Sequence, residues 1–215
     1  MSDKLTLDVV QAAEIKYGAE RNGATNADLK ALSSGDMFAL ILPILRGYGR
    51  VVVDILQKIG ETNFPGAKKF VAKENFKLKK DGGICSYLGS NFTAWFMGKV
   101  EDDVAPSTLT YAKLTKNSKD DAIVASLGGE DKAKTSLVEI FHRISLQPNG
   151  ETGSLLTSGW ANIFYVEDVN GVLRAVDVYW RDDGWRVVAN PVDGPDGWGA
   201  VSLVFSRNPL GTQAV

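Results

Sequence analysis

The stretch from residue 160 to residue 208 constrains the fold of this 215-residue chain more than any other feature. It contains two adjacent runs of alternating apolar and polar residues, RAVDVYW and WRVVAN, with the turn sequence DDG just before the second run. This pattern predicts two antiparallel strands. Side chains point alternately to the two faces of a strand, so one face of this hairpin is predicted to be apolar and buried. Its residues are Val176, Val178, Trp180, Trp185, Val187 and Ala189.

The opposite face of the hairpin is predicted to gather five residues of mixed chemistry. They are Asp177, Tyr179, Arg186, Val188 and Asn190. An acid, a phenol, a guanidinium, an aliphatic group and an amide suit recognition better than catalysis. The alternative interpretation is the ordinary solvated face of a half-buried hairpin.

The composition is typical of a soluble globular protein, with 44% hydrophobic and 23% charged residues and a net charge of −2. This balance gives no indication of nucleic-acid or membrane binding. The first 18 residues lack the apolar core of a secretion signal. The longest apolar run, residues 37 to 45, is too short to span a bilayer and contains Pro43. We therefore expect a cytoplasmic protein, and surface display stays open.

The counts of reactive side chains limit the chemistry. Cys85 is the only cysteine, so neither an intramolecular disulfide nor a multi-cysteine metal site can form. His142 is the only histidine, and it lies off the centre of the apolar stripe of a predicted helix. We expect a boundary position for His142 and a small buried role for Cys85. The sequence predicts no catalytic residue, no bound metal and no cofactor.

Residues 1 to 81 are predicted to form a helical amino-terminal region followed by a basic connector. Helices are expected over residues 7–20, from Thr25 to about Gly35, and after Asp36. A fourth apolar stripe at helical spacing, between Val52 and Ile59, ends at Gly60. Residues 64 to 81 are rich in lysine and are expected to be a solvated connector. Nucleic-acid binding by these lysines is the minor alternative.

Residues 82 to 215 are predicted to form one α+β domain. Helices are expected over residues 91–97, 120–128 and 130–147, with a loop over residues 101–107. After Gly153 the period shortens to that of strands, and an Asn-Gly turn at residues 170–171 predicts a hairpin. The run over residues 201–206 lacks alternation, which predicts a central strand buried on both faces.

Three segments carry a resemblance to a known family: QPNGETGSLLTSGWANIFYVEDVNGVLRAV, the pattern W..DGW.V.A, and VFSRN. They resemble a large family of uncharacterised proteins from uncultivated bacteria with small genomes. That family is similar to the variable proteins of diversity-generating retroelements, which end in a C-type lectin fold. The resemblance covers residues 128 to 208. It implies a C-type lectin-like carboxy-terminal domain in which framework residues surround positions that vary.

The resemblance implies which positions vary. They are Asp177, Tyr179, Asp182, Arg186, Val188, Asn190, Asp193, Asp196, Ala200 and Ser202. Five of these ten are the residues that strand alternation places on one face. Val188 and Ala200 depart from the Tyr, Asp, Asn or Ser usual in the family. The chain also departs by its helical amino-terminal region and by the lack of a secretion signal at its start.

Two classes of function follow from these patterns. The first is a diversified binding protein, without enzymatic activity, whose ligand is an unknown protein or other macromolecule. Tyrosine suits such a surface because it offers contact area and a hydrogen bond at low entropic cost. The second is a calcium-dependent carbohydrate-binding or hydrolytic domain that uses the acidic turns with Asp182, Asp183, Asp193 and Asp196. Asp-Gly pairs are also what tight turns require for conformational reasons.

Overall fold

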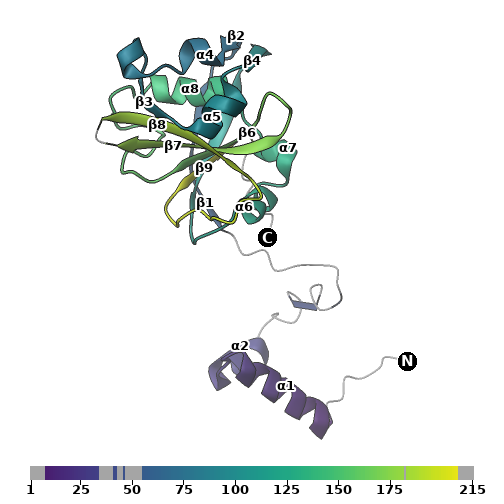
Figure 1. Cartoon of the computed structure of the whole chain (residues 1–215). Helices are drawn as coiled ribbons and strands as arrows, with labels where there is room; N and C mark the ends of the chain where they lie inside the picture. Colours follow the sequence, from purple (N-terminus) through teal and green to yellow (C-terminus); the bar gives the residue numbers. More distant parts are fainter. Residues whose placement is uncertain (1–7, 34–40, 43–45, 47–54, 182, 208–215) are drawn as a thin grey trace. The chain divides into compact units, whose positions relative to one another are not determined.

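The computed structural model describes residues 8–33, 41–42, 46, 55–181 and 183–207 (Figure 1). The chain divides into two compact units, Met1–Val53 and Asp54–Val215. The second unit contains the predicted recognition hairpin. The predicted boundary at residue 81 therefore moves towards the amino terminus, and the segment from residue 54 to residue 81 joins the carboxy-terminal unit.

The first unit contains the two helices that the sequence predicts at its start, α1 (Val9–Arg21) and α2 (Asn26–Ser33). Helix α1 begins with a capping box, in which the backbone N–H of Gln11 donates to Asp8 at 2.7 Å and the Gln11 side chain accepts from Asp8 N–H. Thr25 precedes α2 and exchanges hydrogen bonds with Asp28. The helix expected after Asp36 falls mostly outside the described residues.

The prediction of a fourth helix is wrong, because the carboxy-terminal half of that segment belongs to strand β1 (Leu56–Phe64). Strand β1 pairs along its length with β5 (Ser107–Leu114), and this long-range pairing overrides the helical spacing of its apolar residues. Gly60 is not a helix cap. A Cβ there would lie 2.6 Å from the Tyr111 hydroxyl, so the end of the Tyr111 ring packs directly over glycine at this bulge.

The prediction that the lysine-rich segment is a solvated connector is also wrong, because this segment is a folded part of the domain. It contains β2 (Ala67–Val71), α4 (Ala72–Asn75) and the 3-10 helix η1 (Lys79–Asp81). Phe70 and Phe76 are buried, and their rings lie edge-to-face 5.9 Å apart. The aromatic residues that interrupt the lysines therefore anchor this segment to the core, whereas the lysines beside them in the sequence are exposed.

One seven-stranded mixed sheet organises the second unit, in the order β1-β5-β9-β6-β7-β8-β3. Both predicted hairpins are confirmed, as β6–β7 and β7–β8 are antiparallel. The sheet also contains two parallel pairs, β6–β9 and β3–β8, which the sequence did not predict. The remaining strands of this sheet are β3 (Cys85–Leu88), β6 (Asn162–Glu167), β7 (Leu173–Arg181), β8 (Gly184–Pro191) and β9 (Leu203–Ser206).

Helices cover both faces of the sheet (Figure 1). On one face, α4, α5 (Ser90–Phe96) and α8 (Leu137–Ser145) contribute to a large core with Trp185 and Val187. On the other, α6 (Asp120–Ser126) and α7 (Glu130–Ala133) contribute to a second core with Ile163 and Val204. Strand β9 lies between β5 and β6 and is buried throughout, as predicted for a central strand.

Two predicted elements have different bounds in the structure. The long helix expected over residues 130–147 is two helices, α7 and α8. Between them Lys134 is extended, and Thr135 N–H donates to the Tyr165 carbonyl oxygen at 2.8 Å. The polypeptide thus leaves the helix to bond to β6. The loop expected over residues 101–107 contains most of β4 (Val100–Val104), which pairs with β2 in a separate two-stranded sheet.

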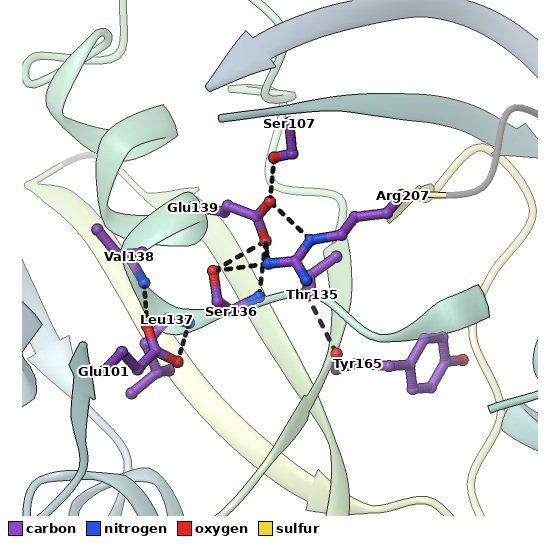
Figure 2. A network of polar contacts seen from close by, with 9 residues as sticks. All are labelled: Glu101, Ser107, Thr135, Ser136, Leu137, Val138, Glu139, Tyr165 and Arg207. Carbon is purple, nitrogen blue, oxygen red and sulfur yellow. Dashed lines mark hydrogen bonds and ion pairs between the residues drawn. The ribbon is translucent and has the colours of Figure 1, made fainter. Parts of the chain in front are cut away.

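A buried polar network holds the start of α8 against the end of the large sheet (Figure 2). The fully buried Glu139 accepts from Ser136 N–H at 2.8 Å, from the hydroxyls of Ser107 and Ser136, and from Arg207 at 2.9 and 3.0 Å. Glu101 accepts from the N–H groups of the first turn of α8 at 3.0 and 2.9 Å. Arg207, part of the VFSRN motif, therefore has a structural role.

Candidate recognition surface

The hairpin of β7 and β8 has the predicted register. Trp180 pairs with Trp185, and Val178 pairs with Val187. Trp185 and Val187 are fully buried, and the Trp185 indole N–H donates to the Gln147 carbonyl oxygen at 2.6 Å. Trp180 is half-buried and lies edge-to-face with Trp185, with ring centroids 5.2 Å apart. The predicted core-facing side of the hairpin is confirmed.

The five residues predicted for the opposite face lie together there. Tyr179 pairs with Arg186, Asp177 pairs with Val188, and Asn190 follows towards the end of β8. Tyr179, Arg186 and Val188 are half-buried, and Asn190 is exposed. Asp177 departs from the expectation of a solvated face, because only 9% of it is exposed. We call this group, extended by Tyr87 as described next, the recognition surface.

Tyr87 belongs to the recognition surface although sequence reasoning missed it. It lies on the edge strand β3, which pairs in parallel with β8 so that Tyr87 is opposite Arg186. The Tyr87 residue is 46% exposed, and the Arg186 guanidinium carbon lies 5.9 Å from its ring centroid. Arg181 makes the equivalent contact with the Tyr179 ring, also at 5.9 Å. The surface therefore carries two tyrosine–arginine contacts side by side on adjacent strands.

Asp177 is electrostatically the most unusual residue of the recognition surface. Its Oδ1 is buried and accepts no hydrogen bond from any described residue. Burial raises the pKa of Asp177 to about 7, against an opposing backbone hydrogen bond from Asn162. Its β6 partner in the register, Ile163, belongs to the second core, so Asp177 lies where that core meets the recognition surface.

Arg186 does not neutralise Asp177 in the structure. Its guanidinium pairs instead with the exposed Asp183, at 3.4 Å between Nη2 and Oδ1. Its buried Nε has no acceptor among the described residues. Among the described residues, three buried side-chain atoms lack a hydrogen-bond partner, and two of them therefore lie on the recognition surface. Buried polar groups are normally hydrogen-bonded, so this concentration needs an explanation.

The other residues that the resemblance implied as variable are not all on this surface. Asp182 lies outside the described residues. Asp193 and Asp196 are exposed in the loop after β8, and Ala200 is half-buried, with its N–H bonded to the Asn117 side chain at 2.8 Å. The expectation that Ser202 is an exposed position is corrected, because only 1% of this residue is exposed. Its carbonyl oxygen accepts from Leu114 N–H at 2.9 Å, which places it in the framework beside β5.

A small pocket adjoins the recognition surface at Asn190. It has a volume of about 140 Å³, and Asn190, Pro191, Asp196 and Trp198 line it together with Asp120 of α6. The Asp120 carboxylate is buried and accepts from Trp198 Nε1 and from the Tyr165 hydroxyl, both at 2.7 Å. The loop after β8 thus forms a pocket rather than a purely exposed connection.

The described residues give little support to metal or nucleophilic chemistry. They contain no group of three or more His, Cys, Asp or Glu side chains that could hold a metal ion. His142 is half-buried at the predicted boundary position, edge-to-face with Phe64 at 5.5 Å, and burial lowers its pKa. Cys85 is buried, as predicted, and burial raises the pKa of its thiol to about 12. A thiol with such a pKa is a poor nucleophile near neutral pH.

The comparisons with known proteins add no assignment. The chain matches no family model, no curated protein and no solved structure. Within the described residues, no helix has both the length and the apolar character needed to cross a membrane. Inference about function therefore rests on the geometry and chemistry of the recognition surface.

Proposed function

We propose that this protein is a ligand-binding protein that recognises a protein or other macromolecule through the recognition surface of β3, β7 and β8. One observation carries the proposal. Tyrosine, arginine and a buried, incompletely bonded carboxylate occur together on one face, directly in front of a closely packed core. Tyrosine and arginine commonly dominate binding energy in protein interfaces. A rigid sheet behind them lowers the entropic cost of binding.

We further propose that the second unit is a C-type lectin-like variable domain of the kind that diversity-generating retroelements alter. The separation of buried from exposed positions supports this. Framework residues implied by the resemblance, such as Trp185 and Phe205, are buried, whereas Tyr179, Asn190 and Asp196 are at least partly exposed. Substitution at such exposed positions usually changes stability by no more than about 0.5 kcal/mol. Asp177 and Ser202 are the exceptions, because both are buried.

A binding role is favoured over a calcium-dependent carbohydrate-binding or hydrolytic role. The alternative depends on the acidic turns, and Asp193 and Asp196 line different pockets. The lysine-rich segment offers the nucleic-acid alternative, yet one of its lysines, Lys79, donates to the Asp183 carbonyl oxygen and lies over the Trp180 ring. At least this lysine has a role within the fold.

Selection of binders tests the proposal. The parent protein is immobilised and used to enrich clones from a displayed library of protein fragments. The same clones are then tested against a variant in which Tyr87, Tyr179, Arg186, Val188 and Asn190 are all replaced by serine. We expect the variant to keep its fold and to lose most of the clones, because a few central aromatic and arginine residues dominate affinity.

A matched control separates recognition from general surface change. In the control variant, the exposed Gln57, Lys58, Ile59 and Glu61 on the edge strand β1 are replaced by serine. We expect this variant to retain the clones. Equal retention by both variants would place the binding site elsewhere. The retroelement assignment has its own test, a search beside the coding sequence for a reverse-transcriptase gene and an imperfect repeat of the 3′ end.

A further inference from the structure

The pocket beside Asn190 is held open by contacts that do not depend on a ligand. Trp198 and Ser118 exchange two backbone hydrogen bonds, at 2.8 and 3.1 Å, which tie the loop to the segment before α6. A Cβ at Gly197 would lie 3.1 Å from the Ser118 carbonyl oxygen, which is closer than most Cβ contacts, so the loop lies tightly against this segment. The Gly194 N–H donates to the Pro191 carbonyl oxygen at 3.2 Å. The pocket is thus preformed, as small-molecule sites usually are.

Asp120 supplies a charged group at this pocket. It is 3% exposed, and its Oδ1 accepts both the Tyr165 hydroxyl and the Trp198 indole N–H. Its other oxygen, Oδ2, accepts no hydrogen bond from the described residues. This oxygen is also not completely enclosed by protein atoms. Burial raises the pKa of Asp120, although its two hydrogen bonds oppose the shift. A donor that enters the pocket would therefore relieve the cost of this burial.

The charge and size of the pocket favour one class of ligand. Its lining contains two carboxylates, Asp120 and Asp196, together with the Trp198 ring, and it contains neither lysine nor arginine. Carboxylates and an indole face attract the same kind of group, a cation that is only weakly hydrated. A volume of about 140 Å³ accommodates the end of one long side chain and not a whole macromolecule.

The position of the pocket connects it to the recognition surface. Asn190 belongs to both, because it ends the row of outward residues on β8 and also lines the pocket. A macromolecule that covers Tyr179, Arg186 and Val188 would therefore reach the pocket with a neighbouring side chain.

We infer that this pocket binds an organic cation, a guanidinium or ammonium group, which a protein partner presents as an arginine or lysine side chain. The inference rests on the proposed function for the identity of the partner, but the cation site can be tested alone. Asp120 accepts a hydrogen bond from the cation through Oδ2, Asp196 contributes charge at the exposed side, and Trp198 contributes its ring.

The experiment uses small probes on the full chain. N-acetyl-arginine amide and N-acetyl-lysine amide are titrated while the indole N–H resonance of Trp198 is followed, with its assignment taken from Trp198→Phe. N-acetyl-citrulline amide, which has nearly the same shape without charge, is the matched neutral probe. We expect saturable shifts with the cations, which should weaken at least about tenfold in Asp120→Asn because a charge-assisted bond is roughly twice as strong as a neutral one.

Two further variants keep the test independent of folding. Asp196→Asn removes an exposed charge and should weaken the cations about threefold without unfolding, within the range of exposed ion pairs. Asp193→Asn removes an exposed charge of the same loop that does not line this pocket, and it should change nothing. Equal shifts with citrulline, equal shifts in Asp196→Asn, or no saturable shift at tens of millimolar would overturn the cation site.

The remaining outcomes separate this inference from the proposed function. A shift produced by calcium chloride alone and lost in Asp196→Asn would replace the organic cation by a metal ion and overturn the inference. If the cations bind but the serine variant of the recognition surface keeps its clones, the pocket stands and the proposed function fails. If the clones are lost but the cations do not bind, the recognition surface stands and the pocket inference fails.

Discussion

Glu139 and Asp177 are both buried carboxylates of the same domain, and they differ in their partners. Glu139 accepts hydrogen bonds at both oxygens, from two serines and from Arg207, within the network of Figure 2. Asp177 has a buried oxygen without a partner, and the nearby Arg186 pairs with Asp183 instead. The first arrangement is what a fold requires of a buried charge. The arrangement at Asp177 is unfavourable for the stability of the fold, and no hydrogen bond to its Oδ1 from the described residues offsets this cost.

This difference separates structural from functional use of a buried acid. The partners of Glu139 come from β5, from the cap of α8 and from the end of β9, so the network joins segments that are distant in sequence. Among the described residues, in contrast, Asp177 accepts only the backbone hydrogen bond from Asn162 on the neighbouring strand β6. Polar groups that a fold leaves unsatisfied are often retained for function. The comparison therefore shows a structural role for Glu139 at α8 and supports the proposed ligand recognition at the hairpin.

The largest expected effect is that of breaking the Glu139 network. Glu139→Ala leaves Arg207 and two serine hydroxyls without their acceptor, and we expect a loss of about 3–5 kcal/mol in the free energy of unfolding. Urea denaturation of the variant and the parent measures it. Glu130→Ala, an exposed acid in the first turn of α7, is the matched control and should cost less than about 1 kcal/mol. A loss as small as that of the control would mean that the network is dispensable.

The two faces of the hairpin should respond differently to truncation. Trp185→Ala empties a fully buried site and removes a hydrogen bond to Gln147, so we expect a loss of about 3–5 kcal/mol. Tyr179→Ala, one ladder position away on the other face, should cost no more than about 1 kcal/mol. Thermal melting of both variants measures the difference. Similar losses would contradict the division into framework and recognition surface.

A smaller effect is expected for the edge of the recognition surface. Tyr87→Ala removes a half-exposed ring from β3 and its contact with Arg186, so we expect a change in stability within about 0.5 kcal/mol. The same substitution should weaken the clones selected on the parent by at least about tenfold. Surface plasmon resonance with the serine variant of β1 as reference measures the weakening. Unchanged affinity would remove β3 from the surface.

Strand alternation made the hairpin register predictable, because a slip by one residue would move Trp185 and Val187 to the wrong face. The membership of Tyr87 was not predictable in this way. It depends on a parallel pairing between strands almost 100 residues apart, of which the segment GGICSYLG gives no sign. The burial of Asp177 was missed for a related reason. Strand alternation predicts on which face of the sheet a side chain lies. How deeply that side chain is buried depends on where the second core ends.

The amino-terminal half of the domain shows where local patterns fail. Apolar residues between Val52 and Ile59 have helical spacing, yet pairing with β5 makes a strand from Leu56 onwards. Similarly, the segment from residue 130 to residue 147 has a continuous helical pattern, but the bond from Thr135 to Tyr165 divides it. In both places a long-range backbone contact prevails over local propensity.

The most direct measurement compares the pH dependence of unfolding in the parent and in Asp177→Asn. Because the folded-state pKa of Asp177 is raised from 3.8 to about 7, the folded protein holds this proton across a window in which the unfolded chain has lost it. The protonated Asp177 therefore contributes fully to the free energy of unfolding below its pKa in the unfolded chain. As the pH rises from there towards its pKa in the folded protein, this contribution falls by about 1.4 kcal/mol for each pH unit. The asparagine variant cannot ionise and lacks this contribution.

We predict that Asp177→Asn gains stability relative to the parent between about pH 4 and pH 7, and that the gain levels off above about pH 8. Chemical denaturation at a series of pH values, with the two proteins measured in parallel, gives this difference directly. Such a gain would mark Asp177 as a residue that the fold does not need in its charged form. A variant that is less stable than the parent at pH 8, with no dependence of the difference on pH, would make Asp177 a structural residue like Glu139 and contradict the account.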